Sequence, residues 1–239
     1  MKSIKEDLKI LIDNFLDQDF KKRTGIETVI LCGSQAMGRA TNRSDIDLCY
    51  IGNFPAFKRE VVYFQNHEFQ LMIAPWEWYE DVLKNYERKS NNGTITSMLS
   101  HGICIYGESE RWINLNNLSK EYFEIGACHP SEKELRRIRM RITELWDNYL
   151  DQVPESIKQL WISYHLIRIC IESQFIVKAW WEVKPKYQIE ELEEKDIYMA
   201  KLVTNCLQAR GVDKQLIYEL CNYVLKPIGG FFREGWSSE

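Results

Sequence analysis

Two aspartates separated by one residue, Asp45 and Asp47, are the residues of this sequence best suited to chemistry. They stand at the start of an apolar run, and in an extended strand residues i and i+2 project from the same face. Two carboxylates held side by side repel each other unless a cation lies between them. Mg²⁺ is the natural candidate, because a few carboxylates and phosphate oxygens satisfy it. The pair therefore predicts a site for one or two Mg²⁺ ions.

A Gly-Ser turn precedes these aspartates, where an apolar run ends at Gly33 and Ser34. Glycine lets the backbone approach a phosphate closely, and the N–H groups of a following short helix point toward an anion. The Ser34 hydroxyl can bond a β- or γ-phosphate oxygen, while Arg39 and Arg43 can neutralise a triphosphate. A plain strand-to-helix turn with solvated arginines is the alternative interpretation.

This arrangement resembles the signature of the DNA polymerase β-like nucleotidyltransferase superfamily: a Gly-Ser turn, a short helix, and Asp-X-Asp on the next strand. The residues that carry the resemblance are Gly33, Ser34, Gly38, Ser44, Asp45 and Asp47. The resemblance implies transfer of a nucleoside monophosphate from an NTP, with ATP favoured, to a hydroxyl group. In the two-metal scheme, one ion activates the attacking hydroxyl and the other grips the triphosphate and the pyrophosphate that leaves.

The resemblance also implies a third carboxylate on a neighbouring strand. Glu68 is the best candidate, because it begins an alternating segment on which Gln70 and Met72 share its face. It would share a metal ion with the two aspartates or serve as general base for the acceptor hydroxyl. A solvated glutamate at the start of a strand is the alternative interpretation.

Two further features lie in the second half of the chain. Glu172 stands in an apolar helical run, where a carboxylate is either paired or functional. Arg168 offers it an intrahelical ion pair, and the functional alternative is that Glu172 binds or deprotonates the acceptor. An aromatic stretch followed by Pro-Lys resembles one in the helical domains of small-molecule nucleotidyltransferases. By that resemblance, Lys184 and Lys186 contact the triphosphate, and basic residues that cap the C-terminus of a helix are the alternative.

The site residues need a sheet to position them, and the hydrophobic patterns predict one. Strands are expected at 26–31, 46–51, 61–64 and 67–74, and helices at 4–18, 76–84 and 94–101. The run at 102–107 resembles the short segment that closes many small nucleotidyltransferase domains. From about residue 119 strand signals vanish, and helices are expected from Ser131, whose spacing to Glu134 is that of a capping box, and at 156–181, 186–195, 197–210 and 213–225. The predicted fold is α+β: a nucleotidyltransferase domain over 1–118 and an all-α acceptor-binding domain over 119–239.

The composition is that of a soluble globular protein, with 239 residues of which 45% are hydrophobic and 28% charged. The net charge of −4 argues against a protein that wraps nucleic acid through bulk electrostatics. No apolar run reaches the length of a membrane span, and the N-terminus lacks the apolar core of a signal peptide. Seven cysteines, without a Cys-X-X-Cys pair and mostly in apolar contexts, predict buried free thiols in a reducing cytoplasm.

A small catalytic domain followed by a helical domain resembles the antibiotic nucleotidyltransferases of the aminoglycoside type. In those enzymes the acceptor lies between the two domains. The resemblance implies antibiotic resistance as the biological role and a cationic small molecule as the acceptor, with which the acidic net charge is compatible.

Two other functions stay open. Members of the superfamily nucleotidylate a protein or tRNA as parts of toxin–antitoxin systems. A tRNA modifier should present a basic face, whereas the dense basic run spreads around its helix, at Arg136, Arg137, Arg139 and Arg141. A non-catalytic nucleotide-binding module is the third hypothesis, against which both aspartates argue. The oligomeric state is open, although many relatives place the active site at a dimer interface.

Overall fold

The computed structural model describes residues 4–210 and 213–235. The chain divides into two compact units, Met1–Ala127 and Cys128–Glu239, here the sheet unit and the helical unit. The predicted boundary after residue 118 falls inside helix α6 (Glu110–Ile125), which the sequence patterns do not predict. Trp112 and Leu115 of that helix are buried in a core of the sheet unit, so the helix is part of that unit.

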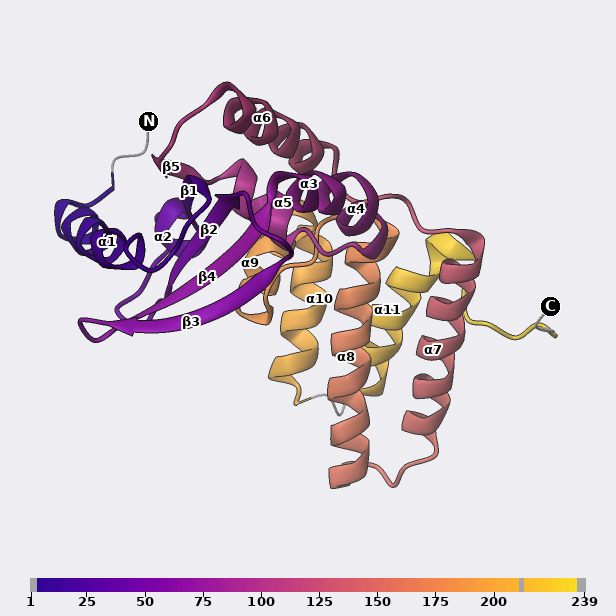
Figure 1. The fold of residues 1–239 in the computed structure, drawn as a ribbon. Helices are drawn as coiled ribbons and strands as arrows, with labels where there is room; N and C mark the ends of the chain where they lie inside the picture. Colours follow the sequence, from indigo (N-terminus) through magenta and orange to yellow (C-terminus); the bar gives the residue numbers. More distant parts are fainter. Residues whose placement is uncertain (1–3, 211–212, 236–239) are drawn as a thin grey trace. The chain divides into compact units, whose positions relative to one another are not determined.

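The sheet unit is built on five strands in the order β3-β4-β2-β1-β5 (Figure 1). They are β1 (Ile26–Cys32), β2 (Ile46–Gly52), β3 (Lys58–Phe64), β4 (His67–Pro75) and β5 (Ile103–Tyr106). Neighbours β2 and β4 are parallel and the other neighbouring pairs are antiparallel, so the sheet is mixed. β3 and β4 form a hairpin whose turn residues, Gln65 and Asn66, both have positive φ, as a type I′ turn requires.

The two faces of this sheet bury different cores. Helix α1 (Glu6–Asp19) covers one face, where Phe15 stacks on Phe69 with ring centroids 3.9 Å apart. The other face packs against α3 (Trp76–Asp81), the π-helical turn η1 (Val82–Glu87), α5 (Thr94–Ser100) and α6. Asp47 has the same parity along the chain as Cys49 of β2, which is buried in this second core, so it projects from the second face. Asp45 immediately precedes the strand.

Two short helices complete the sheet unit. α2 (Gly33–Met37) follows β1 directly, and α4 (Arg88–Ser90) continues η1. Because α2 and its loop join β1 to β2, adjacent antiparallel strands, the Gly-Ser turn and the Asp-X-Asp segment meet at the same edge of the sheet. Local chain connectivity therefore assembles this part of the site.

The helical unit is a bundle in which α7 (Glu132–Leu150), α8 (Ile157–Val177), α10 (Ile197–Gln208) and α11 (Lys214–Leu225) run side by side (Figure 1). α9 (Pro185–Lys195) precedes α10, and the 3₁₀ turn η2 (Lys226–Ile228) follows α11. The capping box of Ser131 and Glu134 is present. α8 ends at Val177 rather than residue 181, because Ala179 takes a φ of +54°. With this all-helical unit after the mixed sheet, the α+β fold class is confirmed.

No helix in the two described ranges is long and apolar enough to cross a bilayer. All seven cysteines are described, and all are free. Five of them are buried as predicted, whereas Cys104 is half-buried and Cys128 is exposed.

Candidate functional site

Asp47 lies against the Gly-Ser turn. The register pairs Asp47 of β2 with Cys32, the last residue of β1, and Gly33 follows at once with a φ of +63°. A Cβ atom on residue 33 would stand 2.0 Å from the Asp47 Oδ2 atom. Only glycine can therefore occupy this position while the carboxylate keeps its place. The turn and the second aspartate form one unit in space, as the sequence spacing predicts.

The loop that leads to Asp45 is fastened by its own polar groups. The Thr41 N–H donates to Ser44 Oγ at 2.9 Å, and the Ser44 N–H donates to the Thr41 carbonyl at 3.0 Å. Asp45 follows directly and is half-buried, as is Ser34 in the turn. Such a turn holds the residue before β2 in place, so Asp45 has a defined position next to the start of the strand.

Gln70 is the centre of the polar network at this end of the sheet, a role that the sequence does not predict. Its Nε2 donates to Asp45 Oδ2 at 2.6 Å and to Glu68 Oε1 at 2.9 Å. Its Oε1 accepts a hydrogen bond from the Arg59 guanidinium of β3. The only hint in the sequence is that Gln70 shares a strand face with Glu68. An amide donor thus stands between two carboxylates that would otherwise repel each other.

Glu68 lies level with Asp45 rather than with Asp47. In the parallel pair of β2 and β4, Ile46 is paired with Phe69 and Asp47 with Gln70. The Tyr63 hydroxyl donates to Glu68 Oε2 at 2.7 Å, and this hydrogen bond, followed by that from Gln70, lowers the pKa of Glu68. The predicted third carboxylate is therefore near the pair but does not stand beside Asp47.

The two carboxylates suit a hard cation that takes its other ligands from a bound phosphate or from water. Asp45 and Asp47 offer carboxylate oxygens, which Mg²⁺ prefers. Among the described residues, no group of three or more histidine, cysteine, aspartate or glutamate side chains is placed to hold an ion. An ion at Asp45 and Asp47 would thus take its remaining ligands from phosphate oxygens or water. The joint metal site of these two residues with Glu68 stays a prediction, because the network in this structure does not assemble it.

The two arginines of the loop, Arg39 and Arg43, are both exposed. The backbone N–H of Arg39 donates to the Ser34 carbonyl at 2.9 Å, which ties the end of the short helix to the turn. Both side chains belong to the loop between β1 and β2, the same loop that carries Ser34. Their contact with a triphosphate stays a prediction.

In the helical unit, the ion pair predicted for Glu172 is present. Arg168 Nε lies 2.6 Å from Glu172 Oε1, on a side of α8 where Arg168 is exposed. Lys184 caps the N-terminus of α9 and Lys186 follows in its first turn, with its ammonium 4.8 Å from the centre of the Tyr187 ring. The alternative prediction of basic C-capping residues is wrong, because both lysines lie at the N-terminus of α9, where the helix dipole does not favour cations. Roles toward acceptor or nucleotide stay predictions for these residues.

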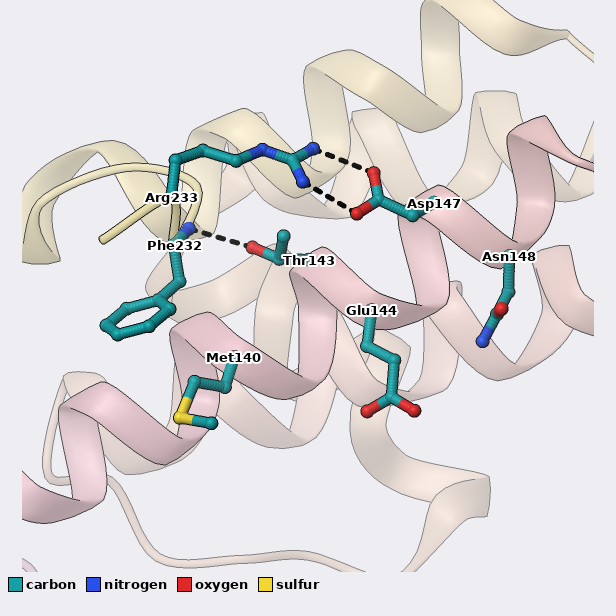
Figure 2. Close-up of a pocket in the computed structure, with 7 residues that line it drawn as sticks. All are labelled: Met140, Thr143, Glu144, Asp147, Asn148, Phe232 and Arg233. Carbon is teal, nitrogen blue, oxygen red and sulfur yellow. Dashed lines mark hydrogen bonds and ion pairs between the residues drawn. The ribbon is translucent and has the colours of Figure 1, made fainter. Parts of the chain in front are cut away.

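A separate depression of about 320 Å³ lies in the helical unit (Figure 2). α7 and the C-terminal segment line it, with Arg233 forming a two-pronged ion pair to Asp147 at 2.7 Å for each contact. The Phe232 N–H donates to Thr143 Oγ1 at 2.9 Å. None of the site residues predicted from the sequence lines this depression. These contacts hold the C-terminal segment against α7.

A sequence model of the family described as "Polymerase beta, Nucleotidyltransferase" matches residues 14–111. The matched stretch contains the Gly-Ser turn, both aspartates and Glu68. Among solved structures, the chain is similar to that of a nucleotidyltransferase-like protein from Exiguobacterium sibiricum 255-15, at 11% identity and a TM-score of 0.44, over 92% of this chain and 78% of that one. No curated protein matches the sequence.

Proposed function

Residues 14–111 are a nucleotidyltransferase domain of the DNA polymerase β-like superfamily, and on this premise we propose that the protein transfers a nucleoside monophosphate to a hydroxyl group. The donor is an NTP, with ATP favoured, and the other product is pyrophosphate. The observation that carries the proposal is the seating of Asp47 on the Gly33 turn, with Asp45 immediately before β2 and bonded to Gln70. This arrangement brings a phosphate-binding turn and two metal-binding carboxylates together.

In the proposed reaction, the acceptor oxygen forms a bond to the α-phosphorus. The bond from that phosphorus to the oxygen bridging to the β-phosphate breaks, and pyrophosphate leaves with the bonding electrons. Asp45 and Asp47 would hold Mg²⁺, which neutralises the charge that develops on the phosphate oxygens. Ser34 would bond the terminal phosphates, with Arg39 and Arg43 facing the triphosphate.

Glu68 is our candidate for the base that accepts the hydroxyl proton. Hydrogen bonds from Tyr63 and Gln70 lower its pKa, so it is ionised at neutral pH, as a base must be. Its place beside Asp45, through the shared Gln70 amide, sets it at the edge of the proposed metal site. Sharing of a metal ion is the alternative role, and it requires the Gln70 amide to move from between the two carboxylates.

For the acceptor, we propose a cationic small molecule of the aminoglycoside type. The net charge of −4 and the order of a catalytic domain before a helical one support this choice. Glu172 is our candidate for contact with the acceptor, and Lys184 and Lys186 are our candidates for contact with the triphosphate. Lysines at the start of a helix have no role in stabilising it, which is consistent with a ligand-binding role.

The test is transfer of label from each α-³²P-labelled NTP in the presence of Mg²⁺. The acceptors are aminoglycosides, lincosamides, bulk tRNA and cell protein. Label on an aminoglycoside supports the full proposal, and label on tRNA or protein replaces the acceptor class. Asp45→Asn should lower transfer about a thousandfold while the fold persists. Asp17→Asn, on the exposed side of α1, is the matched control. Full activity in Asp45→Asn would disprove the metal site, and NTP binding without transfer to any acceptor would favour a non-catalytic module.

A further inference from the structure

An amide occupies the place on β4 that directly adjoins Asp47. The parallel register of β2 and β4 pairs Asp47 with Gln70, and neighbouring strands bring such paired positions closest together. Glu68 lies two residues earlier on the same face, level with Asp45. A carboxylate at residue 70 would complete a group of three acids on adjoining strands, whereas Gln70 leaves a group of two.

The hydrogen bonds of Gln70 define which end of its amide faces the carboxylates. Its oxygen accepts from Arg59, a group that can only donate, so the nitrogen is the end that points to Asp45 and Glu68. The amide oxygen is therefore already bonded to a cation and is not offered to a metal ion. Gln70 orients the Asp45 carboxylate, as hydrogen-bonded groups around metal ligands commonly do, without adding a ligand.

The charges at this end of the sheet also weaken cation binding in the absence of a nucleotide. Gln70 carries no charge where an acid would add one, and the positive charge of Arg59 on its far side acts on Glu68, the other acid bonded to this amide. Affinity for hard divalent cations rises with the number and charge of oxygen ligands. The two aspartates by themselves are therefore a weak cation site. A triphosphate would add the oxygens and the negative charge that the protein does not supply.

We propose that Gln70 makes divalent-cation binding at Asp45 and Asp47 dependent on the nucleotide. The nucleotide-free protein takes up the cation weakly, and cation and triphosphate bind together. This inference rests on the proposed function, because it assumes that the two aspartates face the triphosphate. Gln70 acts here as a positioning residue, since it bonds to Asp45 and has no contact with the cation.

The first test measures Mn²⁺ binding to the nucleotide-free full chain by electron paramagnetic resonance. Wild type should bind Mn²⁺ no more tightly than Asp47→Asn, within about twofold. Gln70→Glu should bind it at least about tenfold more tightly than wild type, because it completes the group of three acids. The matched control is Gln18→Glu, which adds the same charge on the exposed side of α1. Tight Mn²⁺ binding by wild type, or equal binding by Gln70→Glu and Gln18→Glu, would overturn the inference.

Titration calorimetry with the four α,β-methylene nucleoside triphosphates separates this inference from the proposed function. Mn²⁺ should tighten binding of the preferred analogue to wild type at least about tenfold, and it should not do so in Asp47→Asn. If Asp47→Asn keeps the full effect, the metal site itself is wrongly assigned and the proposed function fails. If wild type behaves as expected here but Gln70→Glu gains no affinity for Mn²⁺, only the role of Gln70 fails. Tight Mn²⁺ binding by the nucleotide-free wild type would overturn the inference whether or not Gln70→Glu folds.

Discussion

Each unit contains an arginine and a carboxylate four residues apart, and the two pairs have the same length. Arg23 and Asp19 are 2.6 Å apart at the end of α1, and Arg168 and Glu172 are 2.6 Å apart on α8. Their surroundings differ, because the Asp19 side chain is 6% exposed and that of Arg23 17%, against 25% for Glu172 and 68% for Arg168. The same local pattern is thus buried in the sheet unit and solvated in the helical unit.

This difference shows that the spacing of two residues predicts an ion pair but not how much the pair contributes to stability. Arg23 also bonds Glu60 of β3, which links the end of α1 to the edge strand. Its charge lies 5.7 Å from the centre of the Tyr50 ring. The pair of Arg168 and Glu172 lies within α8, and water screens the exposed charge of Arg168. Removing one partner of a buried ion pair is destabilising, because it leaves the other charge buried without a partner. The carboxylate of a solvent-exposed pair stays accessible to a ligand.

Removal of Arg23 should have the largest effect on stability. Arg23→Ala leaves the buried Asp19 carboxylate without its cation, so the free energy of unfolding should fall by about 3 kcal/mol. Urea denaturation at neutral pH measures this change. A loss below about 1 kcal/mol would show that water or another donor replaces the guanidinium, and the contrast between the two pairs would disappear.

Gly33→Ala should have the next largest effect. The left-handed φ of +63° and the contact with Asp47 together should cost about 2 kcal/mol of stability. If the proposed function holds, label transfer should fall about a hundredfold, because the carboxylate must move. Gly38→Ala is the matched control, since Gly38 has a φ of +73° but open space around it. Equal activity of the two variants would contradict the seating of Asp47 on the turn.

The ion pair of Arg23 with Glu60 should also make stability depend on pH in the acidic range. The hydrogen bond from Arg23 is the main cause that lowers the pKa of Glu60 from 4.5 to about 2. A lowered pKa in the folded state contributes stability above the unfolded value, and that contribution is lost as the pH falls from about 4.5 toward 2. The difference in the free energy of unfolding between wild type and Glu60→Gln should be largest above pH 4.5. Its size there should be less than about 1 kcal/mol. A difference independent of pH would show that the pair with Arg23 does not hold this carboxylate ionised.

Arg168→Ala should have the smallest effect, a loss of less than about 0.5 kcal/mol by urea denaturation. In the same assays, Glu172→Gln should leave stability unchanged and raise the KM for a cationic acceptor if Glu172 binds it. An unchanged KM would leave the ion pair as the only role of Glu172. A large loss of stability in Arg168→Ala would mean that exposure does not separate the two pairs.

Patterns that are local in the chain predicted much of this molecule. The strands that carry Cys32, Asp47 and Gln70 lie within one or two residues of their expected bounds, because alternation of apolar residues is a property of each strand alone. The edge strand β3 begins three residues before the expected 61, since its first residues are polar and exposed. α6 has no prediction at all, because polar residues interrupt its narrow buried stripe of Trp112 and Leu115.

The sequence by itself determined the Gly-Ser turn, the strand that carries Asp47, and the ion pair within α8, since all of these depend on short spacings. Only the tertiary structure decided which residue of β4 adjoins Asp47. Glu68 and Gln70 share a strand face, so alternation cannot choose between them. The choice lies in the register of two strands separated along the chain, which packing such as that of Phe69 on Phe15 sets. For this reason the amide of Gln70, and not a third carboxylate, stands beside Asp47.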